Sequence, residues 1–257
     1  MATYTTEITS DKLVSDNPIH QRLLKAYIAA KPWIKGKLLE VGCGEGRGVE
    51  VLAPNAASYL GLDKIPDVID RLRERFPDCS FEQSVIPPLS TLPSDTFDCV
   101  VSFQVIEHIQ DDRHFLEEIY RVLKPGGNAI ISTPNIHFSL SRNPWHVREY
   151  TPGELKQLCG TVFSAVDARG IGGNAKVMAY HEANRASVQK IMRWDFLGLQ
   201  RRLPAALLRL PYEFLNRLNR NRLHRSQGDQ VTEISHEDYL LMDDPSQALD
   251  LFYILTK

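Results

Sequence analysis

The sequence has few of the features that mark secreted, metal-binding or membrane-spanning proteins. It contains four cysteines in 257 residues and no C-x-x-C pair, so neither a disulfide framework nor the usual spacing of zinc ligands is expected. No apolar run reaches the roughly 18 residues of a membrane-spanning helix, and residues 1–16 lack the apolar core of a secretory signal. We therefore expect a reduced, cytoplasmic protein without a structural metal.

The chain also lacks an excess of charge of one sign. Its 30 Lys and Arg residues and 32 Asp and Glu residues give a formal net charge of −2, which provides no overall attraction to a polyanion. Apolar residues make up 43% and charged residues 24% of the chain, as in ordinary globular domains. The length suits one large domain, or one domain with an insertion.

Short apolar runs alternate with amphipathic segments through the first two thirds of the chain. Helices are predicted from Pro18, over 66–76, after Asp111 and from Thr151. Strands are predicted at 38–41, 59–62, 80–83, 97–103 and 129–132. Strands that alternate with helices of this length indicate a parallel sheet covered on both faces.

The pattern changes near residue 172. Residues 181–225 are expected to be helical and to be broken at Pro204 and Pro211, and 249–255 is expected to form a last strand. The predicted parts are a helical N-terminal segment (1–35), a core (36–172), a helical insertion or lid (173–247) and a final core strand (248–257).

Three glycines follow the first predicted strand. Gly42, Gly44 and Gly46 permit a tight turn and a close approach of a ligand, and ligands of open α/β sheets bind at the carboxyl ends of the strands. A dinucleotide fingerprint, G-x-G-x-x-G, would need glycine at position 47 or 49, which are Arg47 and Val49. The turn therefore predicts a nucleotide-type ligand other than a dinucleotide.

Asp63 ends the second predicted strand, 17 residues after Gly46. A carboxylate at this place can accept hydrogen bonds from both hydroxyls of a ribose. The alternative is that Asp63 only caps the following turn.

Five segments, taken in order, resemble the class I S-adenosylmethionine-dependent methyltransferases, and specifically the type 11 family of small-molecule enzymes. They are residues 40–46, 61–63, 96–98, 105–108 and 121–127, within a likeness that runs from about 36 to 170. The resemblance implies a Rossmann-like, doubly wound sheet of seven strands in the order 3-2-1-4-5-7-6. The last strand would be antiparallel, with the helical insertion before it, and the cofactor would be S-adenosyl-L-methionine.

The resemblance also implies positions for the cofactor. Glu40 would face the methionine end or order the turn, Asp63 would hold the ribose, and Ser84 or a backbone amide would replace an aspartate that the family often has after the third strand. The full set of expected cofactor-binding residues is Glu40, Gly42, Cys43, Gly44, Gly46, Asp63, Lys64, Ile65, Ser84, Val85, Gln104 and Val105.

Methyl transfer needs alignment of donor and acceptor, and a hydroxyl acceptor also needs a base. His108, His137 and His146 are candidate bases, and we expect His108 and His146 to be the catalytic residues, although His108 could instead be structural. In the segment 143–150 we expect a pocket role for His146 and structural roles for Arg148 and Glu149. No metal is expected.

The predicted activity is methyl transfer to a small-molecule or lipid-linked acceptor at oxygen. N-methylation, a non-catalytic regulatory protein that binds S-adenosylmethionine, and a nicotinamide oxidoreductase are the alternatives. No N/D-P-P-Y/F segment follows the fourth predicted strand, which argues against the enzymes that methylate a nitrogen of adenine or of glutamine.

The predicted insertion is basic. Ten Lys and Arg residues and three acidic residues lie between His181 and Gly228, interleaved with leucines and aromatics. A helical lid with solvated arginines, a helix that lies on the inner face of a membrane through residues 181–225, and contact with nucleic acid are three interpretations. The third is disfavoured because no recognition fold accompanies the charge. The sequence does not indicate an oligomeric state.

Overall fold

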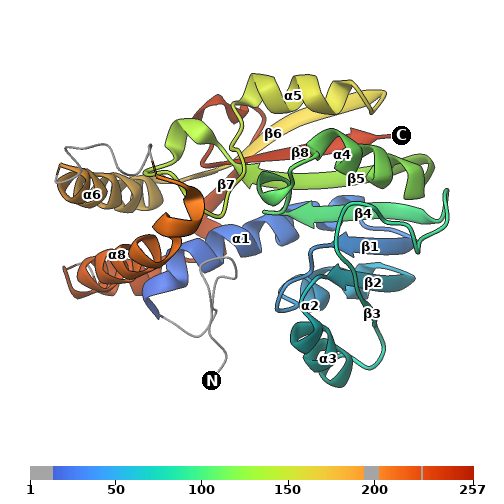
Figure 1. Ribbon diagram of the computed structural model, residues 1–257, viewed down its shortest axis with the longest axis horizontal. Coiled ribbons are helices and arrows are strands. Elements are labelled where there is room, and N and C mark those ends of the chain that lie inside the picture. Colours follow the sequence, from blue (N-terminus) through green and yellow to red (C-terminus); the bar gives the residue numbers. More distant parts are fainter. Residues whose placement is uncertain (1–13, 194–202, 227) are drawn as a thin grey trace.

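The structure is a computed structural model that describes residues 14–193, 203–226 and 228–257. One sheet of eight strands forms its centre (Figure 1), in the order β3-β2-β1-β4-β5-β8-β6-β7. The strands are β1 (Lys37–Val41), β2 (Ser58–Asp63), β3 (Ser80–Gln83), β4 (Phe97–Phe103), β5 (Leu123–Pro134), β6 (Ala165–Gly173), β7 (Tyr239–Met242) and β8 (Asp250–Thr256).

Neighbouring strands from β3 to β5 are parallel, whereas β8 is antiparallel to both β5 and β6. This arrangement confirms the predicted doubly wound fold and its antiparallel last strand. β7 adds an eighth, edge strand, antiparallel to β6, which the sequence did not predict and which lies inside the predicted insertion.

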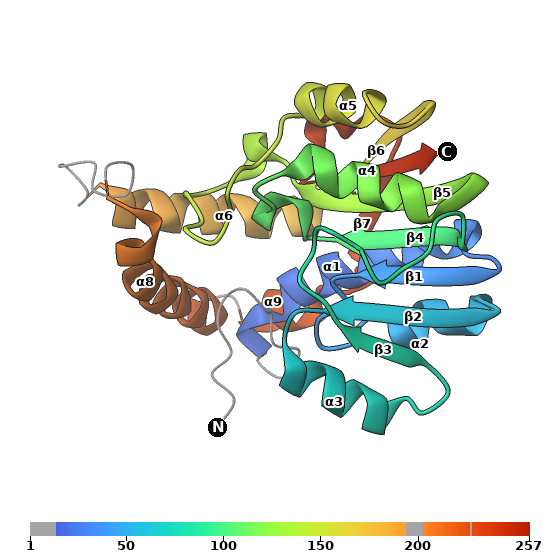
Figure 2. The same ribbon diagram turned by 45° about the vertical axis from the view of Figure 1, so that its right-hand side comes forward.

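Helices cover both faces of the sheet (Figures 1 and 2). They are α1 (Asn17–Ala30), α2 (Val49–Leu52), α3 (Pro66–Arg75), α4 (Asp112–Val122), α5 (Pro152–Gly160), α6 (Ala175–Met192), α8 (Ala205–Ser226) and α9 (Gly228–Glu233). The predicted caps are present. The Asp111 carboxylate accepts from the His114 amide, and Thr151 and Glu154 form a capping box at α5.

Two hydrophobic cores result, one on each face. Leu38 and Leu39 are both fully buried but point to opposite faces of the sheet, because side chains alternate along a strand. Leu38 packs in the core that contains Tyr27 of α1, and Leu39 in the core that contains Phe115 of α4. The buried cores hold the carboxyl ends of β1, β2 and β4 in register.

Two predictions of local structure were wrong. β5 begins at Leu123 rather than near 129, because Leu123 pairs with Phe97 of β4, and because the Lys257 amide donates to the Gly127 carbonyl at 3.1 Å and the Gly126 amide donates to the Lys257 carbonyl. The last residue of the chain thus extends the strand through the proline–glycine segment. α8 also continues through Pro211.

Pro211 removes only one backbone hydrogen bond from a helix of 22 residues. Side-chain contacts anchor α8 on both sides of the proline, at Arg209 and at Arg217. Pro204 immediately precedes the helix, as predicted, and accepts a hydrogen bond from the Leu207 amide. Residues 194–202 of the predicted insertion lie outside the described residues.

α6 and α8 extend beyond the carboxyl ends of the parallel strands (Figures 1 and 2). None of the described helices combines the length and the apolar composition needed to cross a membrane.

Candidate active site

Two cavities open at the carboxyl end of the sheet. The turn cavity, of about 360 Å³, is lined by the glycine turn and the ends of β2 and β4. The insertion cavity, of about 260 Å³, is lined by α1, the segment after β5, α6 and α8. Leu23, Gln104 and His108 line both cavities, so the two spaces meet at these residues.

The glycine turn is held against β2 and β4. The amides of Gly42 and Cys43 both donate to the Leu62 carbonyl at 2.9 Å. Gly42 has a φ of 85°, and a Cβ there would lie 2.4 Å from Cγ2 of Val105. Gly44 also has a positive φ, of 49°, but no atom lies within 4 Å of the place of its Cβ. The turn therefore packs closely at Gly42 and exposes bare backbone at Gly44.

Asp63 connects the turn to the end of β2. One carboxylate oxygen accepts from the Gly44 amide at 2.9 Å and the other from the Ile65 amide at 3.1 Å. A carboxylate offers about four lone-pair sites, so both oxygens retain capacity for the hydroxyls of a ribose. Asp63 thus braces the turn and lines the turn cavity.

Glu40 lies behind the turn rather than in the cavity. It is fully buried and accepts hydrogen bonds from the hydroxyls of Tyr27 (2.8 Å) and Tyr59. Burial raises the pKa of its carboxyl to about 7, against the lowering effect of the two tyrosine hydrogen bonds. Of the two roles expected for Glu40, this position favours ordering of the turn.

The structure brings most of the expected cofactor-binding residues to the turn cavity. Those that line it are Gly42, Cys43, Gly44, Asp63, Lys64, Ile65, Val85, Gln104 and Val105. Gly46 instead packs on Leu72 of α3, where a Cβ would lie 2.4 Å from the leucine side chain. Ser84 donates its amide to the Asp63 carbonyl and does not line the cavity.

Sequence reasoning missed several residues that line the turn cavity. They are Leu23, Tyr27, Glu45, Arg47, Ile86, Phe103 and Ile109. Leu23 and Tyr27 are on the apolar face of the predicted first helix, but periodicity shows only that this face is buried. That α1 packs beside the glycine turn follows from tertiary structure.

Gln104 stands at the junction of the cavities with a φ of 57°, a conformation that is uncommon for residues other than glycine. Its amide donates to the Ser132 carbonyl at 2.8 Å. Unfavourable backbone conformations cluster at functional sites, and this one turns the chain from β4 toward His108.

The Nδ1 atom of His108 lies 2.9 Å from the carbonyl oxygen of Trp145. Because a carbonyl can only accept, Nδ1 carries the proton and Nε2 of the neutral ring has the lone pair. The ring stands edge-on to that of His146, with centroids 5.0 Å apart. His108 therefore has the tautomer that a general base at Nε2 requires.

His146 lines the insertion cavity only. Its Nδ1 atom lies 2.6 Å from Glu149, and its Nε2 atom lies 2.8 Å from the side-chain nitrogen of Asn143. Both ring nitrogens thus have partners. The structure places His146 beside His108, where it forms part of the wall of the insertion cavity. This is the kind of position that the expected pocket role requires.

Glu107 is buried next to the histidines. The Thr133 hydroxyl donates to it at 2.9 Å, and burial raises the pKa of its carboxyl to about 7. Within the described part of the chain, Glu107, His108 and His146 have ligand atoms within 4.8 Å of one another, which is a spacing that a metal ion could use. The Nδ1 atoms of both histidines are engaged elsewhere, and the absence of a metal remains a prediction.

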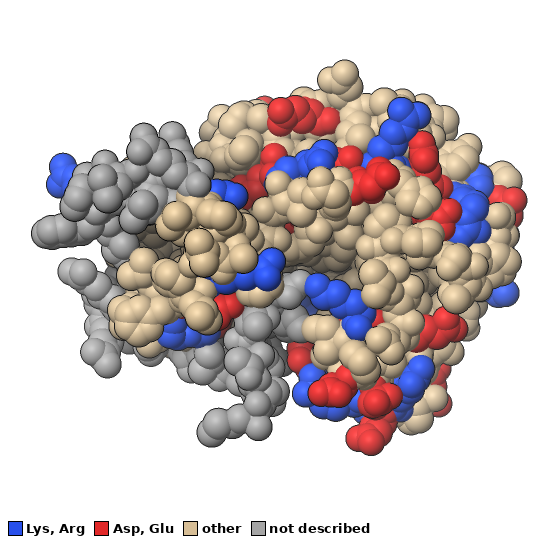
Figure 3. Space-filling model, in the orientation of Figure 1, with Lys and Arg blue, Asp and Glu red and all other residues tan. Residues whose placement is uncertain are grey.

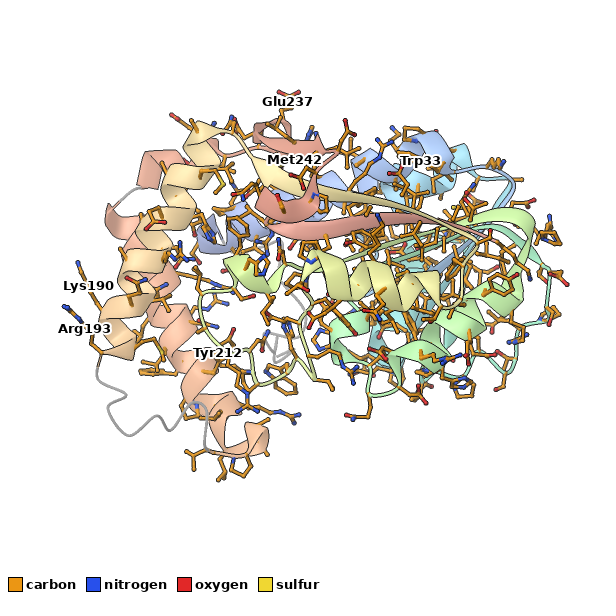
Figure 4. The ribbon with its side chains drawn as sticks, turned by 90° about the horizontal axis from the view of Figure 1, so that it is seen from above. Trp33, Lys190, Arg193, Tyr212, Glu237 and Met242 are labelled. Carbon is orange, nitrogen blue, oxygen red and sulfur yellow. The ribbon has the colours of Figure 1, made fainter. Side chains whose placement is uncertain are left out.

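The insertion cavity contains charges that are paired. Arg22 lies 3.1 Å from buried Asp250, and Arg220 lies 3.1 Å from buried Asp16. His181 of α6 is held neutral because burial, together with nearby arginine, lowers its pKa to about 4. Figure 4 shows Tyr212 on the side of α8 that faces the rest of the molecule. The cavity therefore combines paired arginines and other polar side chains with apolar residues such as Ile19 and Leu249.

The remaining predicted residues lie outside this arrangement. His137 is exposed and lines neither cavity. Arg148 pairs with Asp112 at 2.6 Å, which is the structural role expected for it. Glu149, for which a structural role was also expected, lines the insertion cavity as well as contacting His146.

A methyltransferase domain family matches residues 39–131. The matched segment contains the glycine turn, Asp63 and His108. This chain belongs to the class I S-adenosylmethionine-dependent methyltransferases. The cofactor of this family is S-adenosyl-L-methionine, and the turn cavity has features that fit it, namely an open backbone at Gly44, a carboxylate with spare acceptor capacity at Asp63 and apolar walls at Ile65 and Ile109.

Two curated proteins illustrate the similarity of this chain to other methyltransferases. It is 38% identical over 172 residues to a probable S-adenosylmethionine-dependent methyltransferase of Mycolicibacterium smegmatis, covering 62% of this chain and 66% of the relative. It is 34% identical over 138 residues to the human mitochondrial ubiquinone biosynthesis O-methyltransferase, covering 49% and 34%. The chain thus spans from about a third to about two thirds of these relatives.

A solved structure shows the same fold. The S-adenosylmethionine-dependent methyltransferase of Thermotoga maritima, described as a possible histamine N-methyltransferase, aligns with a TM-score of 0.59 and 14% identity. The alignment covers 93% of this chain and 91% of that one.

Proposed function

We propose that this protein transfers a methyl group from S-adenosylmethionine to a hydroxyl oxygen of a small or lipid-linked acceptor, with His108 as the general base. The observation that supports this most is the position of His108, which lines both cavities and has its lone pair on Nε2. We propose that the turn cavity binds the cofactor and the insertion cavity binds the acceptor.

In this proposal the core (36–172) holds the cofactor, and the insertion (173–247) encloses the acceptor above the final strand (248–257). Bound S-adenosylmethionine supplies a methyl group on a sulfonium sulfur, a good leaving group. Asp63 holds the ribose and the turn amides, while Glu40 keeps the turn in place from behind. The protein otherwise needs to align the acceptor oxygen and remove its proton.

His108 would accept the hydroxyl proton at Nε2. The Trp145 carbonyl keeps the proton of the neutral ring on Nδ1 and stabilises the imidazolium that forms. Buried Glu107 beside the ring adds a carboxylate when it is ionised. Oxygen as the methylated atom is supported by the similarity to the ubiquinone biosynthesis O-methyltransferase.

Calorimetric titration with S-adenosylhomocysteine and with NAD tests the cofactor assignment, and tighter binding of NAD would contradict it. A screen of hydroxyl and amine acceptors with labelled S-adenosylmethionine tests catalysis. A protein that binds S-adenosylhomocysteine but methylates no acceptor in the screen would support the non-catalytic alternative.

We expect His108→Ala to lower kcat by about 10² to 10⁴, as loss of a general base does. The Kd for S-adenosylhomocysteine should change by less than about threefold, because the turn itself is intact. His137→Ala is the matched control, since His137 is exposed and lines neither cavity. Unchanged turnover in His108→Ala would favour an amine acceptor, which needs no base, and a collapse of cofactor affinity would make His108 a binding residue.

A further inference from the structure

Helix α8 exposes an unusual number of large apolar side chains. Five of the nine exposed large hydrophobic side chains in the described residues belong to it. This apolar stripe of α8 consists of Leu207, Leu210, Phe214, Leu215 and Leu218, with exposed fractions of 63%, 77%, 65%, 42% and 49%. Leu207, Leu210, Phe214 and Leu218 follow one another at helical spacing of three or four residues, so they share one side of the helix.

The polar side of the same helix faces inward. Tyr212, Asn216, Asn219 and Arg220 line the insertion cavity. Their helical positions lie opposite those of the apolar stripe, since 3.6 residues make one turn. An amphipathic helix on the surface of a globular protein normally has the reverse orientation.

Specific contacts hold α8 in this orientation. Arg217 and Arg220 both pair with Asp16, a buried carboxylate, at 3.1 Å. Asn219 donates to Asn184 of α6 at 2.8 Å and accepts from the Ser187 hydroxyl. Near the start of the helix, the guanidinium of Arg209 lies 4.0 Å above the ring of Trp145. The outward direction of the stripe therefore follows from buried polar contacts on the other side of α8.

Basic residues are present at the end of α6 and in α8. Lys190 and Arg193 are exposed, form no ion pair within the described part of the chain, and project away from the end of α6 in Figure 4. Two further arginines, at positions 222 and 225, occur in the last turns of α8. In Figure 3 the described surface over α8 is mainly uncharged, with both basic and acidic side chains at its borders.

We propose that α8 docks on an anionic lipid surface, with its apolar stripe in the interface and the basic residues at the head groups. Apolar side chains beside Lys and Arg are the composition that such helices need. A second copy fits less well, because a two-fold interface through the stripe would bring the basic ends of both copies into one interface without added acidic partners.

Docking in this way places the insertion cavity one helix away from the membrane. An acceptor that is anchored in the lipid would then present its head group to the cavity, whose lining combines paired arginines and other polar side chains with apolar residues. The acceptor class, a lipid-linked hydroxyl compound, rests on the proposed methyl transfer, whereas the docking itself does not.

Flotation of the full chain with vesicles tests the docking without cofactor or acceptor. We expect the protein to float with phosphatidylcholine vesicles that contain phosphatidylglycerol, and to remain unbound with phosphatidylcholine alone. Leu210→Gln combined with Phe214→Gln should weaken binding about tenfold or more. Leu240→Gln, at an exposed leucine of β7, is the matched control and should bind as the wild type does.

Affinity for S-adenosylhomocysteine should be unchanged in both variants, which verifies their fold. If the double variant loses this affinity, Lys190→Glu with Arg193→Glu provides the test, because these residues lie outside both cavities and their reversal should also weaken binding about tenfold. Equal binding to both kinds of vesicle, or undiminished binding of the folded variants, would overturn the proposal. The proposal would also be overturned if the wild type sediments as a dimer and the double variant sediments as a monomer.

Discussion

The turn cavity and the insertion cavity meet at His108 but are built in different ways. The first is formed mainly by the ends of consecutive strands and by short turns between residues 42 and 109. The second combines α1, the segment 134–149, α6 and α8, which lie as far as 200 residues apart in the chain. A cavity made of strand ends suits a ligand of constant shape, whereas one enclosed by an insertion can differ between proteins with the same core.

Each cavity also has a buried carboxyl group nearby, and the two groups have different surroundings. Glu40, behind the turn cavity, accepts from two tyrosine hydroxyls, whereas Glu107, which lines the insertion cavity, accepts from Thr133 and lies beside two histidines. Burial raises the pKa of both to about 7. Only Glu107 is positioned to change the charge near the proposed base.

Removal of the Asp63 carboxylate should have the largest effect on the turn cavity. Asp63→Ala loses two hydrogen bonds to backbone amides and the proposed ribose contacts. At about 1.5 kcal/mol for each of two charge-assisted bonds, the Kd for S-adenosylhomocysteine should rise about 100-fold. Calorimetry measures this rise, and Asp70→Ala, at an exposed carboxylate of α3, is the control. Affinity within a few-fold of wild type would reduce Asp63 to a turn cap.

A methyl group at Gly42 should destabilise the turn itself. In Gly42→Ala the new Cβ lies 2.4 Å from Val105 at a φ of 85°, so we expect a loss of about 3 kcal/mol in unfolding free energy. Urea denaturation measures it. Adding Val105→Ala should recover the steric part of the loss. Gly153→Ala, with no atom within 4 Å of its Cβ, is the control, and an equal loss there would contradict the packing explanation.

Glu107→Gln should change the pH dependence of stability without disturbing the turn cavity. The folded-state pKa of about 7 exceeds the ordinary glutamate pKa of 4.5, so the folded state binds the proton more tightly. The contribution of Glu107 to the stability of the wild type should therefore be fully present below about pH 4.5. It should be lost as the pH rises toward and through 7.

The unfolding free energy of wild type minus that of Glu107→Gln should fall by about 2 kcal/mol between pH 5 and 8, so that the variant is favoured at high pH. Urea denaturation at several pH values measures it, and Glu117→Gln, at an exposed side chain of α4, is the control. Affinity for S-adenosylhomocysteine should stay within about threefold of wild type. A parallel pH profile in wild type and variant would show that Glu107 ionises normally.

Local sequence patterns predicted the elements of the core well where apolar residues recur at a regular spacing along the chain. The fourth strand was predicted at 97–103 and is β4 (Phe97–Phe103), and the capping box at Thr151 starts α5. β6 and β7 were missed. β6 contains three glycines, and its buried and exposed residues do not alternate with the period of two that is typical of a half-buried strand. The sequence pattern therefore did not indicate a strand there.

The sequence by itself determined the class of sheet, the glycine turn and the place of Asp63, because these depend on residues close together in the chain and on backbone freedom that only glycine has. Only the tertiary structure decided that α1 completes the turn cavity, that Trp145 sets the tautomer of His108, and that Asp16 turns the apolar stripe of α8 outward. The contacts of Trp145 and Asp16 join residues 37 and 201 positions apart, and neither periodicity nor spacing specifies which distant partner a side chain will meet.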